Sequence, residues 1–269
     1  MEPFSPGGSY QFTRRAYVSS DDGNGYLIEK ILPSKRVNLL AGISSAGKSR
    51  GFLPALVMWS VGLPVMGLKS HPVPWCVVCR DRPIQDAIDT ITSMGFAEGD
   101  VTLIPAYGKD SKSRSLIMAE IEKCGAKFIF WEGFDLMVSN PNKASVVDEF
   151  LGEVTAYCQD GLTILGSVGV AKLKPYETYA NPRQLVAGSS VWERSTSTNM
   201  ILVPRCPGNL EDARRVLFVS LKNEPSFTLG GHFNGTGALE FDNWEDRLNG
   251  RMLEEALEDV RGKKRRVHP

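Results

Sequence analysis

The sequence predicts an α/β fold in which helices flank a mostly parallel sheet, with an antiparallel extension toward the C-terminal end. Three observations support this prediction. Short apolar runs alternate with segments of helical periodicity up to about residue 160, and such alternation favours parallel strands joined by helices. A glycine-rich loop separates the first apolar run from the first helical segment. The stretch 199–240 then has strand patterns separated by turns and no helical pattern, which is typical of antiparallel pairing.

The individual elements follow from apolar periodicity. The strands are expected at 37–41, 75–79, 101–104, 127–131, 162–167, 199–204 and 215–221. The helices are expected at 48–61, 83–95, 112–123 and 143–158. Residues 26–36 lead into this core.

The chain of 269 residues fits one large domain or at most two small ones. We expect a flexible arm at 1–25, an α/β domain at 26–242, and a C-terminal segment at 243–269. That last segment has an acidic helix near 244–260 and a basic tail at 261–269. The tail fits a solvated end, an electrostatic DNA contact or a nuclear address.

Composition narrows the class of protein. Apolar residues make up 42% and charged residues 23% of the chain, as in soluble globular proteins. Lys and Arg number 31, and so do Asp and Glu, so DNA binding would need a local patch rather than a global basic field. No stretch approaches 18 apolar residues, and we expect no membrane partner. Five cysteines without a recognisable signal peptide suggest reduced thiols in the cytoplasm.

Cys76 and Cys79 have the C-x-x-C spacing of a metal or redox motif. They lie inside an apolar strand, and no second pair at zinc-finger spacing accompanies them. Buried strand thiols are the favoured interpretation, with metal binding as the alternative.

The segment from Gly42 to Ser49 reads G-x-x-x-x-G-K-S, the pattern of a phosphate-binding loop. The glycines allow backbone N–H groups to point at phosphate oxygens. Lys48 would place a positive charge on the β and γ phosphates, and Ser49 would ligate Mg²⁺. The helix that follows directs its positive end at the same anion. The expected ATP-binding residues are Gly42, Ser44, Ser45, Ala46, Gly47, Lys48, Ser49 and Arg50.

Such a loop needs a carboxylate on the Mg²⁺ side, normally at the end of another apolar strand. Glu132 ends the strand 127–131 and is the first candidate, and Asp135 is the alternative. Asp81 follows the strand 75–79 and is a candidate for orienting the attacking water, with Arg80 and Arg82 beside it. Because parallel strands open on one crevice, all three acids are expected near the loop.

The stretch 172–187 is polar and interleaves basic and aromatic residues, a makeup suited to holding a nucleic-acid backbone and stacking on bases. An ordinary exposed loop has the same composition. The candidate nucleic-acid contacts are Lys172, Lys174, Tyr176, Tyr179 and Arg183.

Together these segments resemble the RecA/KaiC-like P-loop ATPases, in particular the RepA-like hexameric helicase group. The resemblance covers about residues 26–240 and rests on the loop 42–49, Arg80-Asp81, the strand ending at Glu132, Ser167 to Lys172, Gly188-Ser189-Ser190 and Leu221-Lys222-Asn223. It implies a RecA-like core in a ring of usually six subunits, with ATP between neighbours and central loops on single-stranded DNA. It also implies that Lys222 acts on the γ-phosphate of the neighbouring subunit.

The chain departs from that family at several positions. Arg80 stands where the family usually has Glu, Glu132 where it has Asp, and Asn223-Glu224 where the late Lys-x-Arg pair would have its arginine. These departures motivate one of the alternatives below, a protein that binds ATP but hydrolyses it weakly.

From the resemblance, the first hypothesis is a ring-forming DNA helicase or translocase that hydrolyses ATP and acts in the replication of a phage or plasmid. The alternatives are a filament-forming recombination or loading ATPase, and an assembly protein that binds ATP but hydrolyses it weakly.

Overall fold

The computed structural model describes residues 25–42, 46–60, 62, 68–94, 101–170, 186, 190–204, 213–222, 225–233 and 239–241. Within these ranges the chain forms a nine-stranded sheet with the order β11-β10-β9-β8-β3-β7-β6-β4-β5, and a separate two-stranded sheet, β1-β2. The strands are β1 (Tyr26–Ile28), β2 (Leu32–Pro33), β3 (Val37–Gly42), β4 (Trp75–Cys79), β5 (Thr102–Pro105), β6 (Phe128–Trp131), β7 (Thr163–Val168), β8 (Thr198–Pro204), β9 (Arg214–Leu221), β10 (Phe227–Phe233) and β11 (Leu239–Phe241).

The pairing divides the large sheet into two parts. From β8 through β3, β7, β6 and β4 to β5, every neighbouring pair is parallel. From β8 through β9 and β10 to β11, every pair is antiparallel. The chain is therefore an α/β protein with a mostly parallel sheet and an antiparallel C-terminal extension, which confirms the fold class predicted from the sequence.

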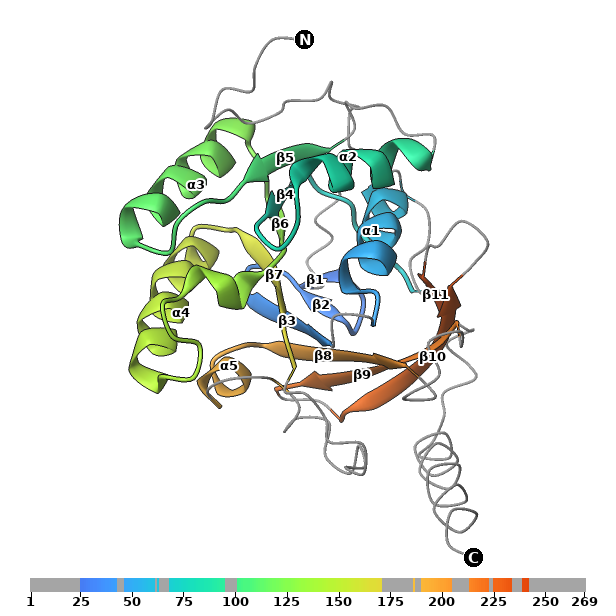
Figure 1. Ribbon diagram of the computed structural model, residues 1–269. Coiled ribbons are helices and arrows are strands. Elements are labelled where there is room, and N and C mark those ends of the chain that lie inside the picture. The colour runs from blue at the N-terminus through green and yellow to red at the C-terminus, as the bar shows by residue number, and fades with distance from the viewer. Residues whose placement is uncertain are drawn as a thin grey trace, which may run out of the picture.

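Helices cover both faces of the sheet (Figure 1). The helical elements are η1 (Lys48–Phe52), α1 (Leu53–Ser60), α2 (Ile84–Ser93), α3 (Ser111–Cys124), η2 (Phe134–Met137), α4 (Ala144–Gln159) and α5 (Val191–Arg194). Helices α1 and α2 pack on one face, where the β1-β2 hairpin joins them. Helices α3, α4 and α5 pack on the other.

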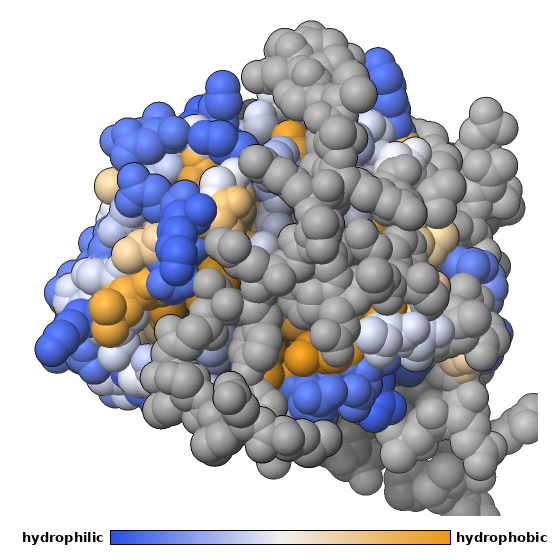
Figure 2. Space-filling view, turned by 90° about the horizontal axis from the view of Figure 1, so that it is seen from above, coloured by the Kyte–Doolittle hydropathy of each residue, from blue (hydrophilic) through white to orange (hydrophobic). Residues whose placement is uncertain are grey.

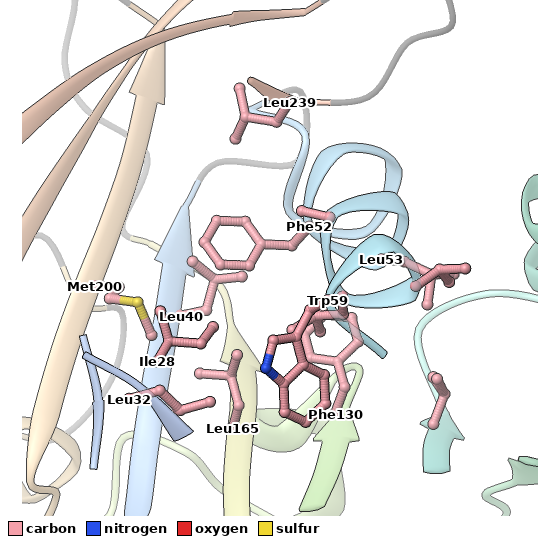
Figure 3. Close-up of a cluster of buried hydrophobic side chains, with 14 of the residues drawn as sticks. Ile28, Leu32, Leu40, Phe52, Leu53, Trp59, Phe130, Leu165, Met200 and Leu239 are labelled. Carbon is pink, nitrogen blue, oxygen red and sulfur yellow. The ribbon is translucent and has the colours of Figure 1, made fainter. Parts of the chain in front are cut away.

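The parallel strands are buried on both faces because helices cover both, and this explains their continuous apolar runs. Alternate residues of each strand enter opposite cores: Leu40 of β3 and Phe130 of β6 face α1, whereas Leu39 and Ile129 face the layer of α3 and α4. Figure 3 shows the first core. There the side chains of β3, β6, β7 and β8 meet Phe52, Leu53 and Trp59 of the η1–α1 segment.

The core on the other face is built around four large aromatic residues. Phe134 lies 5.4 Å from Trp131, 4.8 Å from Phe150 and 5.8 Å from Trp192 between ring centroids. All four side chains are almost fully buried. Since Phe134 belongs to η2, this packing fixes the turn that follows β6.

The expected strands agree with the structure to within about two residues, and so do helices α2, α3 and α4. The expected helix 48–61 is two elements, because its first turn is a wider π-helical turn. Pro54 has no N–H for the Arg50 carbonyl, so the ordinary i to i+4 bond is missing there. The sequence analysis did not identify β1, β2, β10, β11, η2 or α5 as separate elements. The arm at 1–24, the helix 244–260 and the basic tail lie outside the described residues.

On the face shown in Figure 2, hydrophilic side chains lie mostly around the rim, and apolar side chains lie nearer the middle. Tyr107, Leu116 and Leu136 are the exposed large hydrophobic residues among those described. In the same ranges, no helix combines the length and the apolar character that crossing a membrane requires.

We expect Gly166→Ala to destabilise the fold. Gly166 lies in β7, and a Cβ there would overlap ring carbons of Phe134 at the centre of the aromatic core. Overpacking of this kind costs typically about 1–3 kcal/mol in the free energy of unfolding. Urea denaturation measures the change.

Gly152→Ala is the matched control. Gly152 lies exposed within α4, and a Cβ there would meet nothing within 4 Å. Since alanine is favoured over glycine in a helix by roughly 0.5–1 kcal/mol, this variant should be more stable than the wild type. Equal effects of the two substitutions would contradict the packing described for Phe134.

Candidate functional site

Four of the polar residues singled out from the sequence, Lys48, Asp81, Glu132 and Asp135, lie at one edge of the sheet. Strands β3, β4, β6 and β7 are parallel, so the segments that follow them all emerge at their carboxyl ends. Those segments begin at Gly42, Arg80, Glu132 and Gly169. In parallel sheets this edge is where ligands bind.

The loop after β3 is shaped by close backbone approach. A Cβ on Gly42 would lie 2.8 Å from the carbonyl oxygen of Leu202 in β8. Gly47 has φ +96°, a left-handed conformation that favours glycine. Ala46 is fully buried. Ile43, Ser44 and Ser45 lie outside the described residues, so two of the expected phosphate contacts have no described position.

Lys48 turns back over this loop. Its ammonium donates a hydrogen bond to the carbonyl oxygen of Gly42, and the residue is only 8% exposed. Ser49 is half-buried and Arg50 is exposed on the first turn after the loop. The amide of Gly51 donates to the carbonyl of Gly47 at 2.7 Å, which ties that turn to the loop.

Burial and two nearby carboxylates shift the pKa of Lys48 in opposite directions. Desolvation lowers the pKa of its ammonium, while the negative charges of Asp81 and Asp135 raise it. Asp81 follows β4 and is exposed, and Asp135 lies in η2 after β6 and is half-buried. The structure therefore brings the loop lysine together with acids from two other strand ends.

Asp135 is held in place by the strand end next to it. The backbone N–H of Gly169, just past β7, donates to its Oδ2 at 3.1 Å. Burial raises the pKa of Asp135, and the bond from Gly169 acts in the opposite direction. The carboxylate of Asp135, the second candidate from the sequence, is therefore near enough to Lys48 for their charges to interact.

Glu132, the first-ranked carboxylate, has a different environment. It is completely buried, and its Oε2 accepts a bond from Nε of Arg82 at 3.0 Å. Its other oxygen, Oε1, has no hydrogen-bond partner among the described residues. Arg82 also reaches the hydroxyl of Thr90 in α2 at 3.4 Å. Glu132 therefore joins the ends of β4 and β6 through an internal ion pair.

A tight turn brings the ends of β4, β6 and β7 into contact. Gly133 has φ +65°, and a Cβ there would lie 3.1 Å from the backbone nitrogen of Asp81. Its N–H donates to Oγ of the buried Ser167 at 3.1 Å. The hydroxyl of Ser167 thus fixes this turn.

The sequence analysis missed Arg215 and Phe233. Arg215, in β9, is buried, and its Nε donates to the carbonyl of Ala46 at 3.1 Å. Its guanidinium lies 4.5 Å from the ring centroid of Phe233 in β10. The sequence alone could have indicated this position of Arg215. Side chains alternate between the two faces along a strand, so Arg215 lies on the same face as the apolar Leu217 and Val219 and is predicted to point inward.

Lys222 is not part of this cluster. It follows β9 next to the pair Thr198–Leu221, at the start of β8, and thus at the opposite edge of the sheet from the loop. Its ammonium lies 3.5 Å from the carbonyl oxygen of Arg194, and its side chain is exposed. At about 3.3 Å per residue, Lys222 and Arg215 are on the order of 20 Å apart along β9. Any action of Lys222 on a bound phosphate would therefore be on a neighbouring subunit.

The C-x-x-C pair is split between the two cores. Cys76 packs with the α3–α4 layer and Cys79 with the α1–α2 layer, so both are buried strand thiols and cannot share one ligand. Across the described ranges no group of three or more His, Cys, Asp or Glu side chains is arranged to hold a metal ion. Lys172, Lys174, Tyr176, Tyr179 and Arg183 lie outside those ranges.

Comparison of the sequence with models of known protein families finds no match, and comparison with curated proteins finds none either.

We expect Arg82→Met to destabilise the protein strongly. The substitution leaves the carboxylate of Glu132 buried without a compensating charge, which typically costs about 3–5 kcal/mol. The double variant Arg82→Met/Glu132→Gln removes that charge and should recover much of the loss. Urea denaturation of both variants measures this.

Lys123→Met provides the comparison, because the exposed Lys123 pairs with the half-buried Glu120 at 3.8 Å on the outside of α3. Exposed pairs contribute about 0–1 kcal/mol. A cost for Arg82→Met no greater than that for Lys123→Met would refute the internal role of the Arg82–Glu132 pair.

Asp135→Asn should stabilise the protein at neutral pH. The pKa of Asp135 is raised in the folded state. Its contribution to the free energy of unfolding is therefore fully present below its unfolded pKa of 3.8 and is lost as the pH rises through the raised folded pKa. The neutral amide avoids this loss and can still accept the bond from Gly169. We expect a higher urea midpoint than wild type at pH 7 and no gain near pH 3.5. Asp148→Asn, at an exposed site on α4, should change neither midpoint.

Proposed function

We propose that this chain binds ATP with Mg²⁺ at the loop 42–50 and hydrolyses it, as a RecA-like P-loop ATPase acting in a homo-oligomer on single-stranded DNA. The observation that carries the proposal is the buried Lys48 directly after Gly47, whose ammonium bonds to the Gly42 carbonyl at the end of β3 and interacts with the charges of Asp81 and Asp135. A phosphate chain is a ligand that an ammonium at this place can bind through charge-assisted hydrogen bonds.

The surroundings of the loop fit such a ligand. Gly47 has the backbone geometry that aims successive N–H groups at an anion, and the η1–α1 segment begins directly after it. On binding, the Lys48 ammonium would exchange the carbonyl of Gly42 for phosphate oxygens. Strand β3 lies between β7 and β8 in the sheet, and Asp135 and Asp81 follow β6 and β4, the next two strands beyond β7.

Mg²⁺, when bound with ATP, would neutralise developing charge on the β and γ phosphates. The Ser49 hydroxyl and the Asp135 carboxylate are the groups best placed to hold it, directly or through water. Asp135 is half-buried and fixed by Gly169, whereas Glu132 is engaged by Arg82. Asp81, exposed beside the loop, is the candidate for orienting the attacking water.

A weakly hydrolysing assembly protein is the second candidate. It is favoured by the position of Glu132, which is fully buried and paired, and by that of Lys222, which lies at the far edge of its own subunit. Oligomerisation that depends on ATP, with negligible phosphate release, would support this candidate over the motor.

Lys48→Met should abolish high-affinity nucleotide binding. A hydrogen bond to a charged group contributes about 1.5–3 kcal/mol, so the dissociation constant for ATP should rise at least about tenfold. Isothermal titration with ATP and Mg²⁺ measures binding. Phosphate release with and without single-stranded DNA measures turnover, and DNA should stimulate the wild type.

Lys127→Met is the control, since Lys127 is exposed and precedes β6 at the opposite edge of the sheet. It should bind and hydrolyse ATP like the wild type. Wild-type protein that binds no ATP would disprove the proposed site, and binding without turnover would leave the assembly protein as the better account.

A further inference from the structure

We propose that Arg215 and Phe233 act as a latch that holds the phosphate loop in its binding conformation from the antiparallel side of the sheet. This inference rests on the proposed nucleotide site. It makes Arg215 a positioning residue that acts through the loop backbone rather than through the nucleotide.

The register places Arg215 level with the loop. Gly42 pairs with Leu202 of β8, and Leu202 pairs with Leu217 of β9. Arg215 lies two residues beyond Leu217 on the same face, and therefore just past the carboxyl end of β3. From this height the side chain of Arg215 reaches the carbonyl of Ala46.

The arginine is anchored at both ends of its guanidinium. Nε donates to the carbonyl of Ala46 at 3.1 Å, and one terminal nitrogen donates to the carbonyl of Arg214 at 2.8 Å. Ala46 immediately precedes Gly47, so the bond fixes the orientation of the peptide that leads into the left-handed residue. A planar group with several donors suits this position, since lysine would supply only a point charge.

Phe233 closes the other side of the latch. Gly231 of β10 lies opposite Arg215 and has no side chain, so the guanidinium can extend over the strand to Phe233 at 4.5 Å. A Cβ on Gly47 would overlap that ring, and one on Gly51 would lie 2.9 Å from it. The ring thus packs directly against the glycines at the beginning and end of the first turn.

Strand β11 extends the same contact. A Cβ on Gly51 would lie 2.8 Å from Cβ of Leu239, and Leu239 belongs to the core around α1. Figure 3 shows Leu239 above the η1–α1 segment, next to Phe52. The antiparallel strands therefore contact both the loop and the beginning of the helix. A substitution at Arg215 should change the positions of the loop N–H groups that would bind phosphate.

The test compares Arg215→Met, Arg215→Lys and Phe233→Leu with the control Arg214→Met. Arg214 lies on the exposed face of the same strand. Isothermal titration measures the affinities for ATP and ADP in the presence of Mg²⁺, hydrogen exchange measures protection of the peptides covering 46–52, and steady-state kinetics separates kcat from KM.

We expect Arg215→Met to weaken ATP and ADP equally, by about tenfold or more, because both nucleotides use the same loop. KM should rise while kcat at saturating ATP stays within about twofold, and exchange should quicken in residues 46–52 but not in β6 or β7. Phe233→Leu should have the same effects to a smaller degree, and Arg215→Lys should restore part of the affinity. Arg214→Met should behave like the wild type.

Three outcomes would overturn the latch. Unchanged affinity and exchange in Arg215→Met and Phe233→Leu would show that the loop holds its conformation without them. A loss confined to ATP would show that Arg215 contacts the γ-phosphate itself. Faster exchange throughout the protein would assign it a general structural role. If the wild type binds neither nucleotide, the proposed function fails, while the exchange measurement still tests whether these residues hold the loop.

Discussion

The buried ammonium of Lys48 is the constraint on which the rest of the site depends. A charge with so little exposure needs compensation, and the protein supplies the Gly42 carbonyl and the carboxylates of Asp81 and Asp135. Those groups come from three strand ends. They share one side of the molecule because β3, β6 and β4 belong to the same parallel sheet, and their carboxyl ends therefore lie at the same edge. The sheet order, the turn at Gly133 and the packing of Phe134 all serve to keep these groups at fixed positions.

The loop is held from two sides that fold differently. On the parallel side, Asp135 is fixed by Gly169, and the Arg82–Glu132 pair joins β4 to β6. On the antiparallel side, Arg215 of β9 donates a hydrogen bond to the loop backbone at Ala46. The parallel strands contribute to the loop only those side chains that follow their carboxyl ends. The antiparallel extension contributes a group that the parallel part lacks, because β9 begins level with the loop and Arg215, near its start, faces inward.

The sequence predicted the parallel strands well because strands buried on both faces leave continuous apolar runs. It predicted a glycine-rich loop between the first of these strands and the first helical segment because that pattern is local in the chain, and phosphate binding by this loop stays a prediction. It did not predict β10 as a separate strand, since Gly230, Gly231 and His232 interrupt its apolar pattern. The Arg82–Glu132 pair and the contact of Arg215 with Ala46 join residues far apart in the chain. They depend on strand order and register, which no local pattern contains.

The residues of the site are kept at a cost to stability. Burial lowers the pKa of Lys48 and raises that of Asp135. The charged form of each group is therefore less favourable in the folded protein than in the unfolded chain. The Arg82–Glu132 pair lies beside them, and a buried pair of this kind contributes little net stability although breaking it is expensive. The large aromatic core behind η2 and the apolar core around α1 must offset these costs. On the proposed function, a bound phosphate chain and its cation would add their charges to those that the protein itself places at this edge of the sheet.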